Sequence, residues 1–450
     1  MRKLLLLCAI VFAIFSSCKK NRSDSGAGNS RTKDQLVKDS SFAYAREIFL
    51  WFDQLPSSLN TDGFSNPDGI MRHIRQFSRE TGFANPVDRF SFGALKKDWD
   101  NISSGVAADF GMRVFFRTTN DLRVSSVDSK GPAGIAGIKR GWRITSINGV
   151  AITDTSQSNF IVNTVYAAPT TRFVFTLPDN STRELTLNSQ IFTGDPFAVD
   201  SVYTYGANRI GYFVLNSFLG DTNKVRQDVD RIFSRFAAAG ITDLVVDLRY
   251  NGGGYVLLAR YLLDYLVPNS GNGQMMFTNQ FNSKYAAQFN NTASFAKKGA
   301  VNLNRIFFIV SRQSASASEL TINSIKPFMD VKIVGPSPTN GKPVGFFPIP
   351  VGDWYIFPVS FRTINRNNEA NYYNGFIPDY TSPDGLDRNW GDVEEACLSR
   401  AIRFITTGSW ARVAPGDGKL LDEQLQLRKV NAQLDVTHFS GMVGSGLQLK

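Results

Sequence analysis

Two loops of the sequence have the residue types of a site that stabilises an oxyanion. An Asn-Gly-Gly-Gly stretch at 251–254 follows an apolar run at 241–248, and its glycines permit successive backbone N–H groups to point into one cavity. A Ser/Ala-rich stretch at 314–319 follows the apolar run 305–310 and opens an expected helix over 317–326. A serine there lies at the positive end of the helix dipole, which favours an alkoxide or a bound anion. Each feature alone is also compatible with an ordinary turn or helix cap.

The general base of such a site would have to be a lysine or a carboxylate. A Ser-His-Asp triad requires a well-placed histidine, and the chain contains only His73 and His438. Lys342 follows the next apolar run, at 331–334, and could reach the same place. A lysine acts as a base only when it is neutral, a state that burial and nearby positive potential can arrange. The Gly-Lys pair at 341–342 also echoes a phosphate-binding loop, but the spacing is one residue too long, so nucleotide binding is rejected.

The composition narrows the possible classes of protein. A length of 450 residues predicts two or three domains, and 42% apolar residues provide material for real cores. Two His and three Cys argue against a zinc cluster, an iron–sulfur site and a disulfide scaffold, so we expect no metal or cofactor. The net charge of +10 is spread along the chain without a Lys/Arg block, so no nucleic-acid partner is expected.

The N-terminus has the features of an export signal. A basic pair precedes an apolar run at 4–15, which is too short to span a bilayer. Two small residues then precede Cys18, an arrangement that resembles a bacterial lipoprotein signal. The resemblance implies that residues 1–17 are removed and that Cys18 is lipidated. The protein would then be anchored in the cell envelope, at the outer membrane of a Gram-negative source, facing the periplasm or the exterior. An ordinary secretory signal with an incidental Cys is the alternative.

The remaining chain predicts a multidomain α+β protein. A polar linker at 18–37 precedes a helical N-terminal domain at 38–107, whose first helix is expected to begin at the capping residues 39–41. Apolar residues then alternate with a period of two, and a hairpin is expected with its turn at 179–180. Strand and helix patterns alternate over 195–412 and predict an α/β core. A polar tail is expected at 413–450.

The stretch 131–149 resembles the signature of a PDZ domain, over about 108–190. It is rich in small residues at 131–141 and ends in Ile-Asn-Gly, although Trp142 stands where the family usually has Asp. The resemblance implies a β-sandwich that captures peptide C-termini by strand addition. The peptide would lie beside the loop formed by Phe110, Gly111, Met112 and Arg113. A structural β-domain with a blocked groove is the alternative.

Four motifs, taken in order, resemble peptidase family S41, the C-terminal processing (tail-specific) serine peptidases. They are Asp-Leu-Arg-Tyr-Asn-Gly-Gly-Gly at 247–254, Ser-Ala-Ser-Ala-Ser-Glu at 314–319, Gly-Lys-Pro-Val-Gly at 341–345 and Gly-Phe-Ile-Pro-Asp at 375–379. The resemblance covers about 108–405 and implies a crotonase-like (ClpP-like) α/β core. Peptidases of this kind act on proteins or peptides with accessible C-termini.

The resemblance also implies roles for particular residues. The nucleophile falls on Ser316 and the general base on Lys342. The oxyanion hole would use backbone N–H groups of Gly252, Gly253 and Ala317. The implied reaction is acyl transfer, in which neutral Lys342 takes the Ser316 proton and water later releases the acyl-enzyme.

Departures from the family pattern keep a second hypothesis open. Ser316 and Lys342 are 26 positions apart, one more than is commonest. Phe346 replaces the Gln that orients the lysine in many members, and Pro327 replaces the Asp of others. Asp330 is near in sequence, but no third catalytic residue is identified. The alternative is a degenerate peptidase that binds peptide C-termini through its PDZ-like domain without cleaving them. The oligomeric state is left open.

Overall fold

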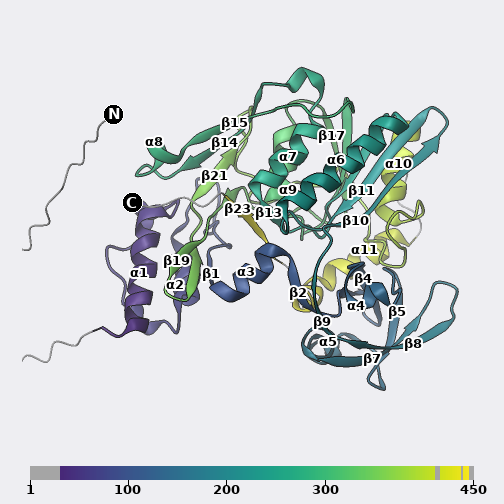
Figure 1. Ribbon diagram of the computed structural model, residues 1–450, viewed down its shortest axis with the longest axis horizontal. Coiled ribbons are helices and arrows are strands. Elements are labelled where there is room, and N and C mark those ends of the chain that lie inside the picture. Colours follow the sequence, from purple (N-terminus) through teal and green to yellow (C-terminus); the bar gives the residue numbers. More distant parts are fainter. Residues whose placement is uncertain (1–30, 411–415, 437–438, 445–450) are drawn as a thin grey trace, which may run out of the picture.

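The computed structural model describes residues 31–410, 416–436 and 439–444 of the chain (Figure 1). The expected signal at 1–17 and Cys18 lie outside these residues. Within the described ranges, no helix combines the length and the apolar character needed to cross a membrane.

A mixed six-stranded sheet forms the centre of the part of the chain from 197 to 407. Its strand order is β10-β11-β12-β16-β17-β22, and every neighbouring pair is parallel except β10 with β11. The strands are β10 (Phe197–Tyr205), β11 (Asn208–Leu215), β12 (Asp243–Asp247), β16 (Arg305–Ile309), β17 (Asp330–Gly335) and β22 (Tyr380–Thr381). The expected buried strands near 241–248, 305–310 and 331–334 are confirmed.

Helices cover both faces of this sheet, because successive residues of a strand point to opposite faces. Val246 and Phe308 lie in one core cluster with α6 (Thr222–Ala239), α7 (Val256–Leu266) and α9 (Ala317–Ile325). Val245 and Phe307 lie in another with α10 (Ala396–Thr407). The strands are therefore buried on both sides, as their nearly continuous apolar runs predict.

The N-terminal part is not a separate helical body. Helix α1 (Lys33–Ile48) begins after Thr32, which forms a capping box with Gln35, so the expected start at residues 39–41 is wrong. Those residues lie inside the helix. Helix α2 (Pro67–Ile74) confirms the second helical stretch, and α1 and α2 share one core cluster with the central sheet. Strand β1 (Phe92–Leu95) pairs with β20 (Trp354–Phe357), and α3 (Lys96–Ser104) follows β1.

A second body contains an antiparallel sheet of order β3-β4-β5-β7-β8 (Figure 1). Its strands are β3 (Met112–Thr118), β4 (Asp121–Val127), β5 (Arg143–Ile147), β7 (Thr170–Thr176) and β8 (Thr182–Asn188), with β6 (Val150–Ala151) beside β5. The short helices α4 (Pro132–Ile135) and α5 (Ser158–Val162) accompany it. The expected hairpin with its turn at 179–180 is confirmed as β7–β8. Strand β3 is an edge strand, and β2 (Val106–Asp109) pairs with β9 (Gln190–Thr193).

Residues 416–436 and 439–444 are folded, unlike the polar tail that was expected at 413–450. Helices α11 (Asp417–Gln426) and α12 (Arg428–Leu434) bury Leu427 and Leu434 in the core of the second body. The Asn431 side chain accepts from the Phe116 N–H at 2.8 Å and donates to the Phe116 carbonyl at 2.9 Å. It thereby satisfies backbone groups of the edge strand β3. Farther along the chain, β23 (Gly441–Val443) pairs in parallel with the short strand β13 (Gly253–Tyr255).

The loop that carries Lys342 leads into a strand of a smaller sheet. Strand β18 (Val344–Gly345) pairs with β21 (Phe361–Ile364), which pairs in turn with β14 (Met275–Phe281). Strand β14 also pairs with β15 (Asn291–Ser294), and β19 (Ile349–Val351) pairs with β20. The loop is therefore anchored at β17 on one side and at β18 on the other.

Candidate active site

Ser316 occupies a strained position at the start of α9. It is the N-cap residue of the helix, with φ 62° and ψ −107°, a combination that residues other than glycine rarely adopt. Its side chain is completely buried, and its Oγ has no hydrogen-bond partner among the described residues. A strained backbone that holds an unpaired hydroxyl is typical of a functional site rather than of a helix cap.

The Glu319 carboxylate joins the Ser316 turn to the Lys342 loop. Its Oε2 accepts from the backbone N–H groups of Ser316 and Lys342, each at 2.8 Å. Its Oε1 accepts from the Gly341 N–H and the Thr339 hydroxyl, each at 2.6 Å. Burial raises the pKa of Glu319, whereas these four donors oppose that rise. One buried carboxylate thus fixes the two loops relative to each other.

Lys342 is completely buried in a pocket lined by aromatic rings. Its Nζ lies 3.9 Å from the ring centroid of Phe346 and 4.8 Å from that of Phe90. Burial lowers the pKa of Lys342 well below its ordinary value, and the nearby charge of Arg75 lowers it further. The charges of Asp88 and Glu319 act in the opposite direction but are outweighed. A neutral amine is the form that a general base requires.

The N-terminal part of the chain helps to hold the Lys342 loop. Arg89 donates from one nitrogen to the carbonyls of Asn340, Gly341 and Tyr373, at 3.0, 3.3 and 3.2 Å. Gly341 has φ +87°, and a Cβ atom there would lie 2.1 Å from the Tyr373 carbonyl oxygen. Only glycine fits at this position, which explains the residue before the lysine.

Two backbone donors are free for an oxyanion. The N–H groups of Gly252 and Ala317 have no acceptor among the described residues. The Gly253 N–H was expected in the oxyanion hole, but it donates to the Asn251 side chain at 2.9 Å. Gly253 serves close packing instead, since a Cβ atom there would lie 2.9 Å from the Ala317 nitrogen. The predicted Gly252, Gly253 and Ala317 are brought together, with two of the three N–H groups available.

The predicted pair is linked through Glu319, which accepts from the backbone N–H groups of both residues, and not through a direct hydrogen bond among the described residues. Among the described residues, Lys342 Nζ donates to the Ser440 carbonyl at 3.1 Å, and no hydrogen bond joins it to Ser316. Phe346 packs against the lysine and provides no polar group to orient it. Asp330 begins β17, at the opposite end of the sheet from the site, and pairs with Lys332 at 2.9 Å. It is therefore not the third residue.

Several residues of the site were not identified from sequence. The roles of Glu319, Asp88, Phe90 and Ser440 depend on contacts between segments that are far apart in the chain. Only Glu319 carried a usable signal, as a carboxylate three residues after an N-cap serine, which is the spacing of a capping box. That pattern predicts the bond to Ser316 but not the bonds to the lysine loop.

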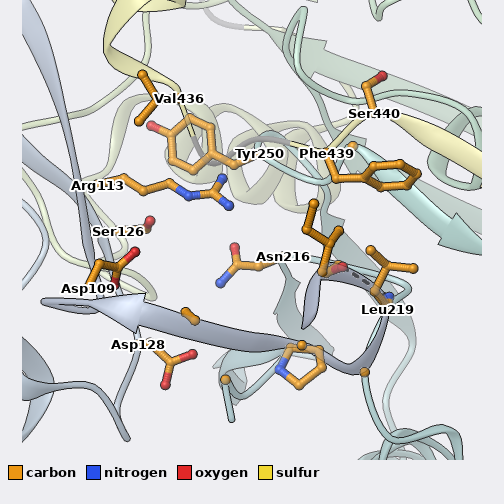
Figure 2. Close-up of a pocket in the computed structure, with 18 of the residues that line it drawn as sticks. Asp109, Arg113, Ser126, Asp128, Asn216, Leu219, Tyr250, Val436, Phe439 and Ser440 are labelled. Carbon is orange, nitrogen blue, oxygen red and sulfur yellow. Dashed lines mark hydrogen bonds between the residues drawn. The ribbon is translucent and has the colours of Figure 1, made fainter. Parts of the chain in front are cut away.

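The loop expected to bind peptide C-termini is mostly internal. Phe110 and Met112 are buried in the core of the second body, and Gly111 lies against Gly131. Arg113 lines a cavity of about 1010 Å³ (Figure 2). Its guanidinium lies 3.8 Å from the Asp435 carboxylate. Helix α12 covers the neighbouring edge of β3.

The strain at Ser316 generates a prediction about stability. Replacing Ser316 by glycine relieves about 1–3 kcal/mol of backbone strain and loses about 0.5–1 kcal/mol through the entropy of the unfolded chain. Ser316→Gly should therefore be about 1 kcal/mol more stable than Ser316→Ala in urea unfolding. At Ser318, inside α9, the order should reverse, because glycine weakens a helix interior. Equal stability of the two Ser316 variants would contradict the strained turn.

The buried lysine generates a prediction about pH. Since the folded pKa of Lys342 is lowered, the unfolded chain binds more protons between that pKa and the ordinary lysine value, so wild-type stability rises with pH. Lys342→Met removes this dependence. The stability of Lys342→Met relative to wild type should fall as pH rises from 6 to 9, by at most about 1.4 kcal/mol per pH unit. The exposed Lys33→Met is the control. A pH-independent difference would show that Lys342 is charged in the folded protein.

Comparisons with known proteins give a family match for part of the chain and several structures with a similar fold. Residues 209–382 match the family model of Peptidase family S41. The crystal structure of a candidate S41 protease from Bacteroides fragilis is similar with a TM-score of 0.69 and 21% identity, over 82% of this chain and 97% of that one. At this identity the likeness concerns the fold alone.

Two further solved structures are more distant. The photosystem II D1 C-terminal processing protease has a TM-score of 0.47 at 18% identity, over 82% of this chain and 96% of that one. Mature CPAF complexed with lactacystin has a TM-score of 0.44 at 11% identity, over 89% of this chain and 99% of that one. No curated protein sequence matches the chain. The part of the chain at 209–382 is thus similar to Peptidase family S41, whose peptidases are serine proteases.

Proposed function

We propose that this protein is a serine endopeptidase that cleaves proteins or peptides near their C-termini, with Ser316 as nucleophile and Lys342 as general base. The observation that carries the proposal is the Glu319 carboxylate, which accepts from the backbone N–H groups of both residues. A structural cap needs only the Ser316 bond. The bonds to the lysine loop serve to keep a buried hydroxyl and a buried amine in one place.

The chemistry follows from the state of each group. Neutral Lys342 accepts the proton of the Ser316 hydroxyl, and the alkoxide attacks the carbonyl carbon of a peptide bond. The N–H groups of Gly252 and Ala317 stabilise the oxyanion, in a site where burial strengthens such bonds. The protonated lysine returns the proton to the leaving amine, and water then hydrolyses the acyl-enzyme by the same route in reverse. Before the first step, the amine must leave the Ser440 carbonyl and turn to Ser316.

The proposal extends to the other parts of the chain. Residues 108–190 would act as a PDZ-like domain for substrate C-termini, beside Phe110, Gly111, Met112 and Arg113. In the present structure α12 lies on its edge strand, so a peptide adds there only after α12 moves. Cys18 would carry the lipid that anchors the protein to a bacterial membrane, at the outer membrane of a Gram-negative source.

A second candidate function is peptide binding without cleavage. It is favoured by the absence of a hydrogen bond between Ser316 and Lys342 and by Phe346, which gives the lysine no polar partner among the described residues. A degenerate enzyme, however, has no need for a strained serine or for a lysine whose pKa is lowered by burial. We therefore favour the peptidase.

Cleavage of an unstructured protein tests the proposal. A form lacking residues 1–18 should cut casein, and Ser316→Ala and Lys342→Ala should each lose at least about 100-fold in rate, because neither remaining group reacts alone. The controls are Ser270→Ala and Lys33→Ala, which are exposed and should keep full activity.

Circular dichroism of each variant checks that it is folded. Full activity in either site variant would contradict the assignment of that residue. If the wild type cut neither casein nor C-terminal tail peptides, the peptidase proposal would be rejected in favour of peptide binding without cleavage.

A further inference from the structure

The chain's own C-terminal strand, residues 439–444, lies against the glycine loop of the candidate active site. Strand β23 runs parallel to β13 (Gly253–Tyr255), with Gly441 opposite Gly253 and Val443 opposite Tyr255. The Gly441 N–H donates to the Gly252 carbonyl at 2.9 Å. This strand is therefore hydrogen-bonded directly to the glycine loop of the candidate active site.

The other side of the C-terminal strand is also paired. The Phe346 N–H donates to the Met442 carbonyl at 3.0 Å, and the Gly444 N–H donates to the Phe346 carbonyl at 2.9 Å. Met442 is completely buried and Val443 nearly so. An extended segment held by backbone bonds on two sides is how proteins bind peptides by strand addition. The backbone groups on the two sides form a groove that binds the main chain of an extended segment.

Carbonyl groups of the C-terminal strand lie at the reacting groups. The Ser440 carbonyl accepts from Lys342 Nζ at 3.1 Å. A Cβ atom built on Gly253 would lie 2.5 Å from the Gly441 carbonyl oxygen and 2.9 Å from the Ala317 nitrogen. The backbone at 440–441 thus occupies the space between the proposed base and the proposed oxyanion donors, where a scissile peptide bond would have to lie.

Side chains of the C-terminal strand are matched to their surroundings. The Phe439 ring lies among aromatic rings, with centroid distances of 5.4 Å to Trp99, 6.4 Å to Phe92 and 6.5 Å to Phe346. Two positions later, a Cβ atom on Gly441 would lie 2.7 Å from the Phe346 ring. The groove therefore has an aromatic pocket followed by a place for a small residue.

The C-terminal strand also separates the reacting pair from the large cavity. Phe439, Ser440 and Gly252 line that cavity of about 1010 Å³, whereas Ser316 and Lys342 do not. Figure 2 shows Phe439 and Ser440 in its wall, across from Asp109 and Asp128. Ser440, which lines the cavity and accepts from Lys342 Nζ through its carbonyl, thus lies at the boundary between the two.

We propose that residues 439–444 occupy the substrate groove, and that the peptides accepted there are extended segments with an aromatic residue two positions before a glycine or another small residue. Such a peptide binds as a strand parallel to β13 after the C-terminal strand is displaced. The proposal rests on the proposed peptidase function, since it assigns the substrate class to the same site.

Peptide binding tests this proposal without cleavage. The probe is a fluorescein-labelled peptide with the sequence of residues 439–444, Phe-Ser-Gly-Met-Val-Gly, measured by fluorescence anisotropy. The protein carries Ser316→Ala and either keeps its full C-terminus or ends at His438. We expect the truncated protein to bind at least tenfold more tightly than the full-length one. Replacing Phe by Ala or the first Gly by Val in the peptide should weaken binding at least tenfold.

A point variant covers the case in which the truncated protein does not fold. Gly441→Val in the full chain should loosen the C-terminal strand, because the new side chain meets the Phe346 and Phe439 rings. It should therefore also bind the probe at least tenfold more tightly than the parent. Gly418→Ala is the control, since no atom lies within 4 Å of a Cβ at that glycine.

Three results would overturn the proposal: no probe binding by folded truncated protein, equal binding of the three peptides, or identical behaviour of Gly441→Val and Gly418→Ala. Because all of these proteins lack the nucleophile, binding is measured independently of peptidase activity. A failed peptidase assay with positive binding would reject the proposed catalysis but keep the groove. A positive peptidase assay with no binding would reject only the groove.

Discussion

A single buried carboxylate organises the candidate active site. Glu319 is completely buried, and its two oxygens accept four hydrogen bonds from Ser316, Lys342, Gly341 and Thr339. Burying a carboxylate is costly, and hydrogen bonds from several donors offset that cost only if all the donors are in place. The helix that carries the serine and the loop that carries the lysine therefore depend on each other, although each follows a different strand of the sheet.

The second body is coupled to the same site through buried charges. Arg140 from that body donates to Asp384 at 2.7 Å and to the Tyr250 hydroxyl at 2.9 Å. Tyr250 donates to Asp384 at 2.5 Å and immediately precedes the glycine loop with its oxyanion donors. Arg249, next to it, binds Asp384 as well, at 2.9 Å. A movement of the second body would break these buried ion pairs and hydrogen bonds, and would therefore change the position of the glycine loop.

Much of this site was predictable from sequence. The remaining contacts were not predictable, and the physical reasons can be identified. Ser316 and Lys342 come together because the carboxyl ends of parallel strands meet at one edge of a sheet, and apolar runs reveal such strands. The helices at 417–434 had a weak signal, Leu427 and Leu434 seven residues apart, within a polar stretch. The pairing of Gly441 with Gly253 had no signal in the sequence, because it joins segments almost two hundred residues apart and depends on backbone groups alone.

The most direct measurement is the value of kcat/KM for Glu319→Gln. The amide keeps the size of the side chain but turns one accepting oxygen into a donor, so it cannot accept from all four partners. We predict that this variant stays folded by circular dichroism and loses at least about 100-fold in kcat/KM on a substrate that the wild type cleaves. A folded Glu319→Gln variant with wild-type kcat/KM would contradict the claim that this carboxylate holds the reacting pair.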